Sequence, residues 1–558
     1  MNLESRLPFA ASHSVVGPAL ASAALFWAAL PPLDLWPAAW IAPVGWLLLV
    51  RRRELPGRRP YAALWLVGFL FWMAAIHWLR LPHWATSIGW VALSGYLGWY
   101  LPLFVGLTRV AVHRLRLSVI VAAPVVWAGL ELARAHLLTG FTMASLGHTQ
   151  YRWIELIQIS DLVGGYGVCF VVMGVGACLA RIVPCEGQRM ALWPLLPAAA
   201  LLAAALVYGR ANMAASLPQP SARIALIQGS IDIELKNDPS QRDFIQEHYL
   251  ELSREAVARF GQVDLIVWPE TMFRETLVVF DERAALPNAW REELPNVRDW
   301  SQADFHRALR YAADRTLSAL ASLARQLDAS LLLGLDTQAF SAEGVRFFNS
   351  AALVRRDGSL GGRYDKMHRV LFGEYVPFAD YFPWLQRFTP LPISLAPGAR
   401  PVSFPLAGLR IAPNICYETV LPHVIRRHVR ELADRGEEPD VLINLTNDGW
   451  FWGSSELDMH LVCGVFRAVE CRKPLLIAAN TGFSAWIDSD GRIVERGPRR
   501  ETGTILARVA AEHRSSPYLR YGDWFAGSCL AVCLMLAVVA VAGRTRRRFA
   551  SLGNTSTG

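Results

Sequence analysis

Charged side chains are scarce in this chain. Asp, Glu, Lys and Arg make up 18% of its 558 residues, whereas hydrophobic residues make up 53%. So apolar a composition excludes an ordinary soluble protein and predicts membrane-spanning helices. The formal net charge is +8, and much of it lies in short arginine clusters beside apolar runs. Clusters in such places are typical of membrane orientation signals, so no nucleic-acid partner is expected.

Cysteine motifs are absent as well. The eight cysteines form no Cys-x-x-Cys pair and show no spacing typical of metal ligands. Five of them lie in or beside apolar runs, namely Cys169, Cys178, Cys185, Cys529 and Cys533. We therefore expect neither a disulfide framework nor a zinc site, and no bound metal.

Long apolar runs predict eight spanning helices. They cover about 15–30, 36–50, 61–79, 88–107, 118–138, 163–183, 192–208 and 524–542, and the first two are short for a span of ~20 residues. Arginines gather after the second, fourth, sixth and eighth runs, while the other connections are nearly free of Lys and Arg. By the positive-inside rule, both ends of the chain are cytoplasmic. The region from about 209 to 521 then lies on the opposite side, which in a bacterium is the periplasm.

These runs predict three parts. They are a membrane domain of seven spans at 1–210, an outer domain at 211–520, and an eighth span with a basic tail at 521–558. Two ionisable residues, Glu131 and Arg134, lie in the fifth span and share one helix face. Charged groups inside a membrane usually face the bundle interior or water. The two residues form either an ion pair that locks helix packing or a polar wall near lipid headgroups.

From Ala222 the pattern changes to that of an α/β domain. Apolar runs predict strands at about 222–228, 263–268, 330–335, 347–354, 410–416, 441–445 and 475–479. Helices are predicted at about 246–260, 305–327 and 459–472, and the charged, proline-rich stretch 280–305 is predicted to be an inserted loop. Strands alternate with helices, so we expect a layered α/β domain with its site at strand ends.

Three reactive side chains stand at such ends. Glu270 follows one strand, Lys366 follows another, and Cys416 closes the run Ile411–Ile415. A cysteine nucleophile needs a base for its proton and a cation near the developing oxyanion, and a carboxylate with an ammonium supplies both. Taken singly, the three residues fit a surface carboxylate, a solvated lysine and a core thiol equally well. Together they favour a nucleophilic site.

The motifs around these residues resemble a known family. Trp268-Pro269-Glu270, Tyr364-Asp365-Lys366 and Asn414-Ile415-Cys416-Tyr417-Glu418 are similar to the Glu-Lys-Cys pattern of the nitrilase (carbon–nitrogen hydrolase) superfamily. With seven spans before this domain and one after it, the chain resembles the membrane-embedded apolipoprotein N-acyltransferase family. The resemblance implies a multi-pass α-helical membrane bundle of about eight spans plus an α/β, nitrilase-like αββα sandwich domain.

The same resemblance implies site residues and substrates. Glu270 would be the base, Lys366 the oxyanion cation and Cys416 the nucleophile, with support from the residues Asn349, Glu374, Tyr417 and Glu418. The reaction implied is transfer of the sn-1 acyl chain of a phospholipid, commonly phosphatidylethanolamine, to the N-terminal diacylglyceryl-cysteine of a prolipoprotein. No cofactor is needed. The expected protein is a monomer in the bacterial inner membrane with its catalytic domain in the periplasm.

Some features depart from the family pattern or leave alternatives open. Asn237 stands where the family usually has a tryptophan, and Thr142-Met143 replaces a usual Pro-Trp. The aromatic segment 372–384 is either a packing loop or a flap that admits acyl chains. Two other functions remain possible. One is a membrane-anchored amidase or nitrilase that uses water as acceptor, and the other is a non-catalytic lipoprotein-binding scaffold.

Overall fold

The computed structural model describes residues 14–186, 188–213, 219–379, 381–389 and 394–553. It divides into two compact units, and each is described by itself. The first comprises Met1–Arg80, Ser87–Ala214 and Ser516–Gly558, and the second comprises Leu81–Thr86 and Ala215–Ser515. The domain limits at 210 and 520 stay a prediction, and the outer ends of the membrane parts, 1–13 and 554–558, lie outside the described residues.

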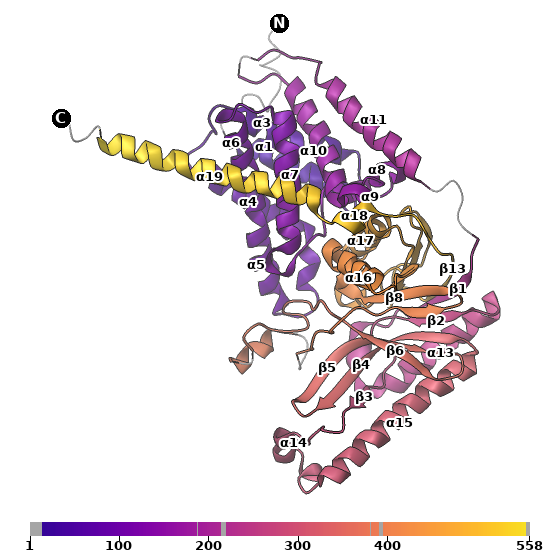
Figure 1. Ribbon diagram of the computed structural model, residues 1–558. Helices are drawn as coiled ribbons and strands as arrows, with labels where there is room; N and C mark the ends of the chain where they lie inside the picture. Colours follow the sequence, from indigo (N-terminus) through magenta and orange to yellow (C-terminus); the bar gives the residue numbers. More distant parts are fainter. Residues whose placement is uncertain (1–13, 187, 214–218, 380, 390–393, 554–558) are drawn as a thin grey trace. The chain divides into compact units, whose positions relative to one another are not determined.

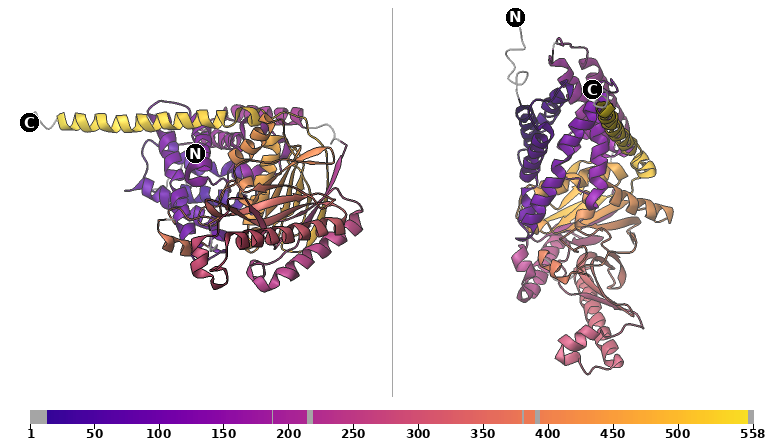
Figure 2. Two further views of the ribbon diagram at one scale, coloured as in Figure 1. Left: turned by 60° about the horizontal axis from the view of Figure 1, so that its bottom comes forward. Right: turned by 90° about the vertical axis from the view of Figure 1, so that its left-hand side faces the viewer.

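The first unit is built from helices (Figures 1 and 2). They are α1 (Val16–Ala29), α2 (Ala38–Ile41), α3 (Pro43–Arg51), α4 (Pro60–Ala75), α5 (Thr86–Gly98), α6 (Tyr100–His113), α7 (Val119–His136), α8 (Ile154–Ile157), α9 (Ser160–Val163), α10 (Gly165–Ile182), α11 (Leu195–Asn212), α18 (Pro517–Tyr521) and α19 (Trp524–Gly553). Prolines explain two breaks inside predicted spans. Pro43 begins α3 just after the end of α2, and Pro102 lies in the first turn of α6, just after the end of α5.

Several of these helices can cross a membrane. Among the described residues, five segments are long and apolar enough: Thr86–His113, Val119–Thr139, Gly165–Ile182, Leu195–Asn212 and Trp524–Gly543. Three shorter apolar helices are Val16–Ala29, Ala38–Arg51 and Pro60–Ala75. A multi-pass helical bundle is thereby confirmed, and the number of eight spans stays a prediction.

Helix α7 carries the two ionisable residues inside this bundle. The Arg134 guanidinium donates to Glu131 Oε2 at 2.5 Å and to the carbonyl of Met143 at 2.8 Å. Ser145 Oγ donates to the same Glu131 oxygen at 3.2 Å. The two charges therefore neutralise each other and fix the loop after α7, as the ion-pair interpretation expects. The Thr142-Met143 departure lies in this loop, and both residues are buried.

The second unit is a sandwich of two mixed sheets (Figure 1). The first sheet has the order β13-β1-β2-β4-β5-β6, with β3 also paired to β4, and the second has the order β12-β11-β10-β9-β8-β7. Strands β1, β2 and β4 run parallel to one another, and so do β8, β9 and β10. The first sheet contains β1 (Ala222–Gln228), β2 (Leu265–Trp268), β3 (Leu277–Phe280), β4 (Ser330–Ser341), β5 (Gly344–Val354), β6 (Leu360–Asp365) and β13 (Gly503–Val509). The second contains β7 (Phe404–Leu406), β8 (Leu409–Ile415), β9 (Val441–Thr446), β10 (Leu475–Ala479), β11 (Ala485–Ile487) and β12 (Ile493–Arg496).

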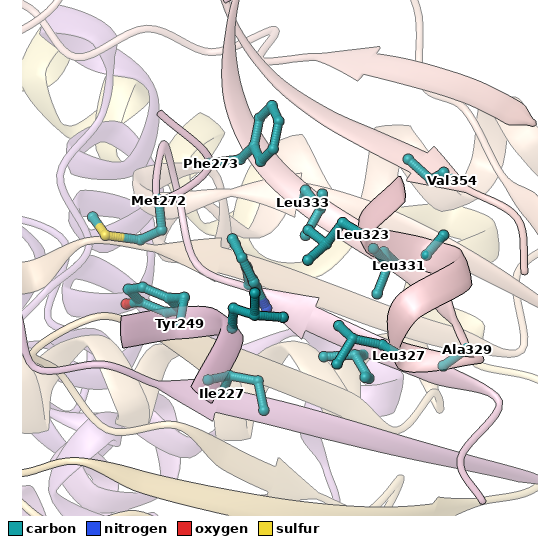
Figure 3. Packing of buried hydrophobic residues seen from close by; sticks show 14 of the residues in the cluster. Ile227, Tyr249, Met272, Phe273, Leu323, Leu327, Ala329, Leu331, Leu333 and Val354 are labelled. Atoms are coloured by element: carbon teal, nitrogen blue, oxygen red, sulfur yellow. The ribbon is translucent and has the colours of Figure 1, made fainter. Parts of the chain in front are cut away.

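Helices cover the outer faces of both sheets. Helix α13 (Arg242–Phe260) and helix α15 (Gln302–Leu327) pack on the first sheet, and α16 (Pro422–Asp434) and α17 (Glu456–Cys471) lie on the side of the second. Figure 3 shows leucines of α15 and β4 interleaved in the outer core. A separate inner core joins the sheets and includes Leu332 of β4 and Ile443 of β9. The four layers confirm the αββα sandwich.

The stretch 280–305 differs from the predicted loop. It holds the short helix α14 (Asn288–Glu293) and a 3₁₀ turn, and its apolar side chains pack with Phe305 and Phe340 into a small core of their own. Prolines interrupt this stretch at both ends of α14, and its apolar residues do not recur at helical spacing. The sequence pattern therefore did not reveal this core.

The inner core predicts where the catalytic domain is sensitive to truncation. Leu332→Ala should destabilise it by about 2–5 kcal/mol, because the side chain is fully buried and leaves a cavity between two sheets. The exposed Val494→Ala on β12 is the matched control, with an expected effect within about 0.5 kcal/mol. Thermal unfolding of the full chain in detergent checks both, and equal midpoints for the two variants would contradict the packing described.

Candidate active site

Four strand ends bring polar groups to one place in the second unit. Glu270 lies two positions after the end of β2. Lys366 comes directly after β6, Cys416 comes directly after β8, and Asn447 comes directly after β9. The first two strands belong to one sheet and the last two to the other. Parallel strands of an α/β sheet present functional groups at their carboxyl ends, and here both sheets contribute to one site.

Glu270 is held on both carboxylate oxygens. Its Oε1 accepts hydrogen bonds from Asn349 Nδ2 at 2.6 Å and from Lys366 Nζ at 3.4 Å. Its Oε2 accepts the backbone N–H of Asn447 at 3.0 Å. The side chain is buried. A carboxylate fixed in this way is suited to accept a proton along one defined direction.

Lys366 lies between two carboxylates. Its Nζ donates to Glu374 Oε1 at 2.7 Å, and the other Glu374 oxygen accepts the N–H of Val370 at 2.9 Å. Burial by itself lowers the pKa of Lys366, but the charges of Glu374 and Glu270 outweigh burial and raise the pKa well above its usual value. Lys366 is therefore a permanent cation at neutral pH, which suits the stabilisation of an oxyanion and not the uptake of a proton.

The predicted strand 410–416 ended at Cys416. In the structure Cys416 instead begins a turn. Strand β8 stops at Ile415, and Cys416 is the first residue of the 3₁₀ helix Cys416–Val420. Its φ of 51° is left-handed, an uncommon conformation outside glycine that is frequent at functional sites. Asn444 Nδ2 donates to the Cys416 carbonyl at 3.2 Å and helps to hold this conformation.

The thiol of Cys416 is neutral in this site. Burial raises its pKa well above the usual value, and the charge of Glu270 raises it further, whereas Lys366 acts in the opposite direction. A neutral thiol needs a base to remove its proton as it attacks. Glu270, whose charge raises the pKa of this thiol, is the candidate for that base.

Glu418 connects the lysine and the cysteine segments. Tyr364 Oη donates to both of its oxygens at 2.8 Å. The backbone N–H groups of Met367 and His368 donate at 2.8 and 2.9 Å, and that of Ile415 donates at 2.7 Å. Glu418 was expected to support the three reactive residues. In the structure its oxygens hold the backbone beside Lys366 and beside Cys416, while Glu374 contacts the ammonium itself.

The other predicted positions lie near this group. The Tyr417 ring stacks on His368, with centroids 6.2 Å apart. Asn349 also accepts the Lys366 N–H through its carbonyl at 2.9 Å, so it links the base and the lysine. Asn237, which replaces the usual family tryptophan, is exposed at the end of α12 (Ile233–Asn237).

Sequence reasoning missed two buried groups beside the site. One is Lys236, whose charge environment includes Glu270 and Cys416. The other contains Asp448, whose Oδ1 accepts from Thr446 Oγ1 at 2.7 Å and lies 3.0 Å from His460 Nδ1. Asp448, Glu456 and His460 place ligand atoms within 4.8 Å of one another, as a metal site would. Asp448 and His460 are twelve positions apart and lie on different elements, so they form no local sequence motif that would have predicted their contact.

The raised pKa of Cys416 predicts its alkylation profile. Iodoacetamide should modify Cys416 slowly near pH 7 and faster as the pH rises beyond about 9, because only the thiolate reacts. Glu270→Gln should move this profile to lower pH, because it removes a charge that raises the thiol pKa. Peptide mass mapping, with Cys416→Ser as the blank, measures the rates. Fast modification with a plateau near neutral pH would contradict a neutral thiol.

Comparisons with known proteins identify the family of this chain. The Apolipoprotein N-acyltransferase N-terminal domain family matches residues 22–178, and the Carbon-nitrogen hydrolase family matches residues 223–518. The apolipoprotein N-acyltransferase of Geobacter metallireducens is 34% identical over 94% of this chain and 94% of its own length. That of Rhodopirellula baltica is 32% identical over 91% of this chain and 94% of its own length.

A solved carbon-nitrogen hydrolase from Helicobacter pylori G27 aligns with 51% of this chain and 88% of its own at 14% identity, with a TM-score of 0.34, too low to carry an argument. The two family matches and the full-length relatives confirm the resemblance that the motifs indicated. The chain therefore belongs to the apolipoprotein N-acyltransferase family and is an acyltransferase built around a carbon–nitrogen hydrolase domain.

Proposed function

We propose that the protein transfers an acyl chain from a phospholipid to the α-amine of an N-terminal diacylglyceryl-cysteine on apolipoproteins, through a thioester on Cys416. The observation that carries this proposal is the neutral, half-buried thiol beside a carboxylate that is itself bound to a permanently charged lysine. That combination supplies a nucleophile, a base and an oxyanion cation to one reacting carbonyl.

The first half-reaction forms the thioester. Glu270 takes the proton of Cys416 while the sulfur attacks the sn-1 ester carbonyl. Lys366 Nζ and the backbone N–H of Tyr417 stabilise the oxyanion. The ester C–O bond then breaks, Glu270 returns the proton to the leaving glyceryl oxygen, and a lysophospholipid departs. The expected donor is phosphatidylethanolamine.

The second half-reaction consumes the thioester. The acceptor amine attacks the same carbonyl, an amide C–N bond forms, the C–S bond breaks, and Cys416 regains a proton. Two sequential acyl transfers at one thiol predict ping-pong kinetics. Asn349 and Glu374 orient Glu270 and Lys366 through the hydrogen bonds they make, and Glu418 positions the backbone on both sides of the site.

Location and access follow from the same proposal. Bacterial relatives and the apolar helices indicate a membrane protein, and the arginine pattern supports a catalytic domain on the periplasmic face of the inner membrane. Both lipid substrates are then in the same leaflet. Phe378 and Tyr381 are 70% and 80% exposed, as expected for an aromatic flap at a membrane interface that admits acyl chains. The protein is expected to act as a monomer.

Labelled acyl transfer tests the function. Purified protein in detergent receives phosphatidylethanolamine labelled in its sn-1 chain and a diacylglyceryl-cysteine peptide. Label should appear as an amide on the peptide, and Cys416→Ser should abolish it because the oxygen nucleophile is not activated by the same base. Label released as free fatty acid, with none on the peptide, would instead support a hydrolase, and no turnover of either kind would support a scaffold.

Lys366 and Glu374 should affect the first half-reaction. Lys366→Met should slow thioester formation by roughly 10²–10³-fold, the usual cost of losing an oxyanion donor. Glu374→Gln should cost less, because it keeps a hydrogen-bond acceptor beside Lys366 Nζ and removes only a charge. Single-turnover loading of Cys416 measures both rates. A Lys366→Met variant that loads at the normal rate would remove the lysine from the oxyanion site.

A further inference from the structure

Lysine is nearly absent from this chain. Of its 55 basic residues only three are lysines, Lys236, Lys366 and Lys473, and all three are buried. Arginine and lysine serve equally on a solvated surface, but a buried arginine cannot lose its proton, whereas a buried lysine can. The three lysines therefore mark buried positions at which the chain has a compact ammonium instead of a guanidinium.

Two of the three have an evident partner. Lys366 is paired with Glu374 and Glu270 in the site described above. Lys473 lies 3.0 Å from Glu438 Oε1 and donates to the Glu512 carbonyl at 3.3 Å. Within the part of the chain that the structure describes, Lys236 has no carboxylate oxygen within ion-pairing distance of its Nζ, although its side chain is buried.

The backbone around Lys236 is fixed to the catalytic base. Arg274 donates to the Lys236 carbonyl at 3.0 Å and, through its other terminal nitrogen, to the Thr271 carbonyl at 3.0 Å, directly after Glu270. Before α12, the Asn480 amide holds the backbone of Ile231 and also donates to Asn447 Oδ1 at 3.0 Å. Arg274 and Asn480 therefore connect α12 and the residues before it to the segments that carry Glu270 and Asn447, and Lys236 is held near the reacting groups.

The charges that surround Lys236 come from every neighbouring element. Glu270 follows β2, Arg274 lies four residues further, Asp336 is on β4, and Cys416 follows β8. Burial lowers the pKa of Lys236 to about 8, Arg274 acts in the same direction, and Glu270, Asp336 and Cys416 oppose it in part. Unlike Lys366, this lysine can lose and regain a proton near neutral pH.

The second half-reaction needs a second base. An α-amine has a pKa of about 7.7–8.0, so the acceptor arrives largely as an ammonium. Its conversion to an amide on a thioester yields an amide, a thiol and one extra proton. Glu270 can move one proton from nitrogen to sulfur, and it is then used. Lys366 is already protonated, so neither residue takes the extra proton.

We propose that Lys236 is the base that takes the extra proton from the acceptor ammonium, a role that rests on the proposed function. A neutral Lys236 amine removes N–H from the incoming ammonium, which leaves a neutral amine free to attack the thioester. The two amines have similar proton affinities, so the transfer costs little free energy. Lys236 thereby allows the site to use an acceptor amine that arrives protonated.

A two-stage single-turnover experiment tests this role. Wild-type protein, Lys236→Met and Lys236→Arg are first loaded with labelled acyl chain from phosphatidylethanolamine, and the thioester is quantified. The diacylglyceryl-cysteine peptide is then added at a series of pH values. Loading should be close to normal in all three proteins. Peptide acylation near pH 7 should be slower by roughly tenfold in both variants, because only about a tenth of an amine with a pKa near 8 is neutral there without help, and it should recover above about pH 9.

Hydroxylamine provides the matched control. It is largely neutral near pH 7, so it needs no base to become a nucleophile, and it should discharge the thioester at equal rates from all three proteins. A slowed discharge by hydroxylamine would mean that Lys236 acts on the thioester itself and would overturn the proposal. Normal peptide acylation by Lys236→Met near pH 7, or by Lys236→Arg, would overturn it too, as would loss of loading in both variants.

Failure of the proposed function has a different signature. In that case the wild-type protein itself would carry no thioester after incubation with the phospholipid, or its thioester would persist in the presence of peptide at every pH. Both results concern the wild-type protein alone, so they are distinguishable from any result that depends on Lys236.

Discussion

A buried ammonium between two carboxylates is the interaction on which the catalytic domain depends. Lys366 is only 2% exposed, and burying an ammonium without partners is strongly unfavourable. Glu374 at 2.7 Å and Glu270 at 3.4 Å compensate it, so removal of Lys366 would leave two buried carboxylates without their cation. The same cluster keeps the lysine charged and holds Glu270 in place, while burial and the charge of Glu270 keep the neighbouring thiol neutral.

The sandwich explains how these charges meet. Glu270 and Lys366 come from strands of the first sheet, while Cys416 and Asn447 come from strands of the second. Two hydrogen-bonded carboxylates cross from one sheet to the other. Glu270 accepts the N–H of Asn447, and Glu418 accepts both the Tyr364 hydroxyl and the Ile415 N–H. The inner apolar core that joins the sheets therefore also determines the geometry of the reaction.

The sequence predicted the elements with a strong apolar pattern and missed those without one. Strand β1 was predicted with its observed limits because it is a continuous apolar run. Strand β6, which carries the chain to Lys366, was missed because its two glycines and its arginine do not form such a run. Strands β7, β11 and β12 and helix α14 are too short to show a periodic pattern of apolar residues. Glu270, Lys366 and Cys416 were predicted as a group because each stands in a family motif, and Glu270 and Cys416 also stand at the ends of predicted strands. Lys236 stands in a polar stretch, and only the rarity of lysine in the chain distinguishes it.

In the proposed mechanism Cys416 carries the acyl chain between the two lipids. Intact-protein mass spectrometry, after incubation with phosphatidylethanolamine of one defined acyl chain, detects this intermediate. A gain of one acyl group per chain is expected, located on Cys416, removed by hydroxylamine and lost when the acceptor peptide is added. Acylation of the peptide without any such adduct on Cys416 under single-turnover conditions would rule out the thioester mechanism.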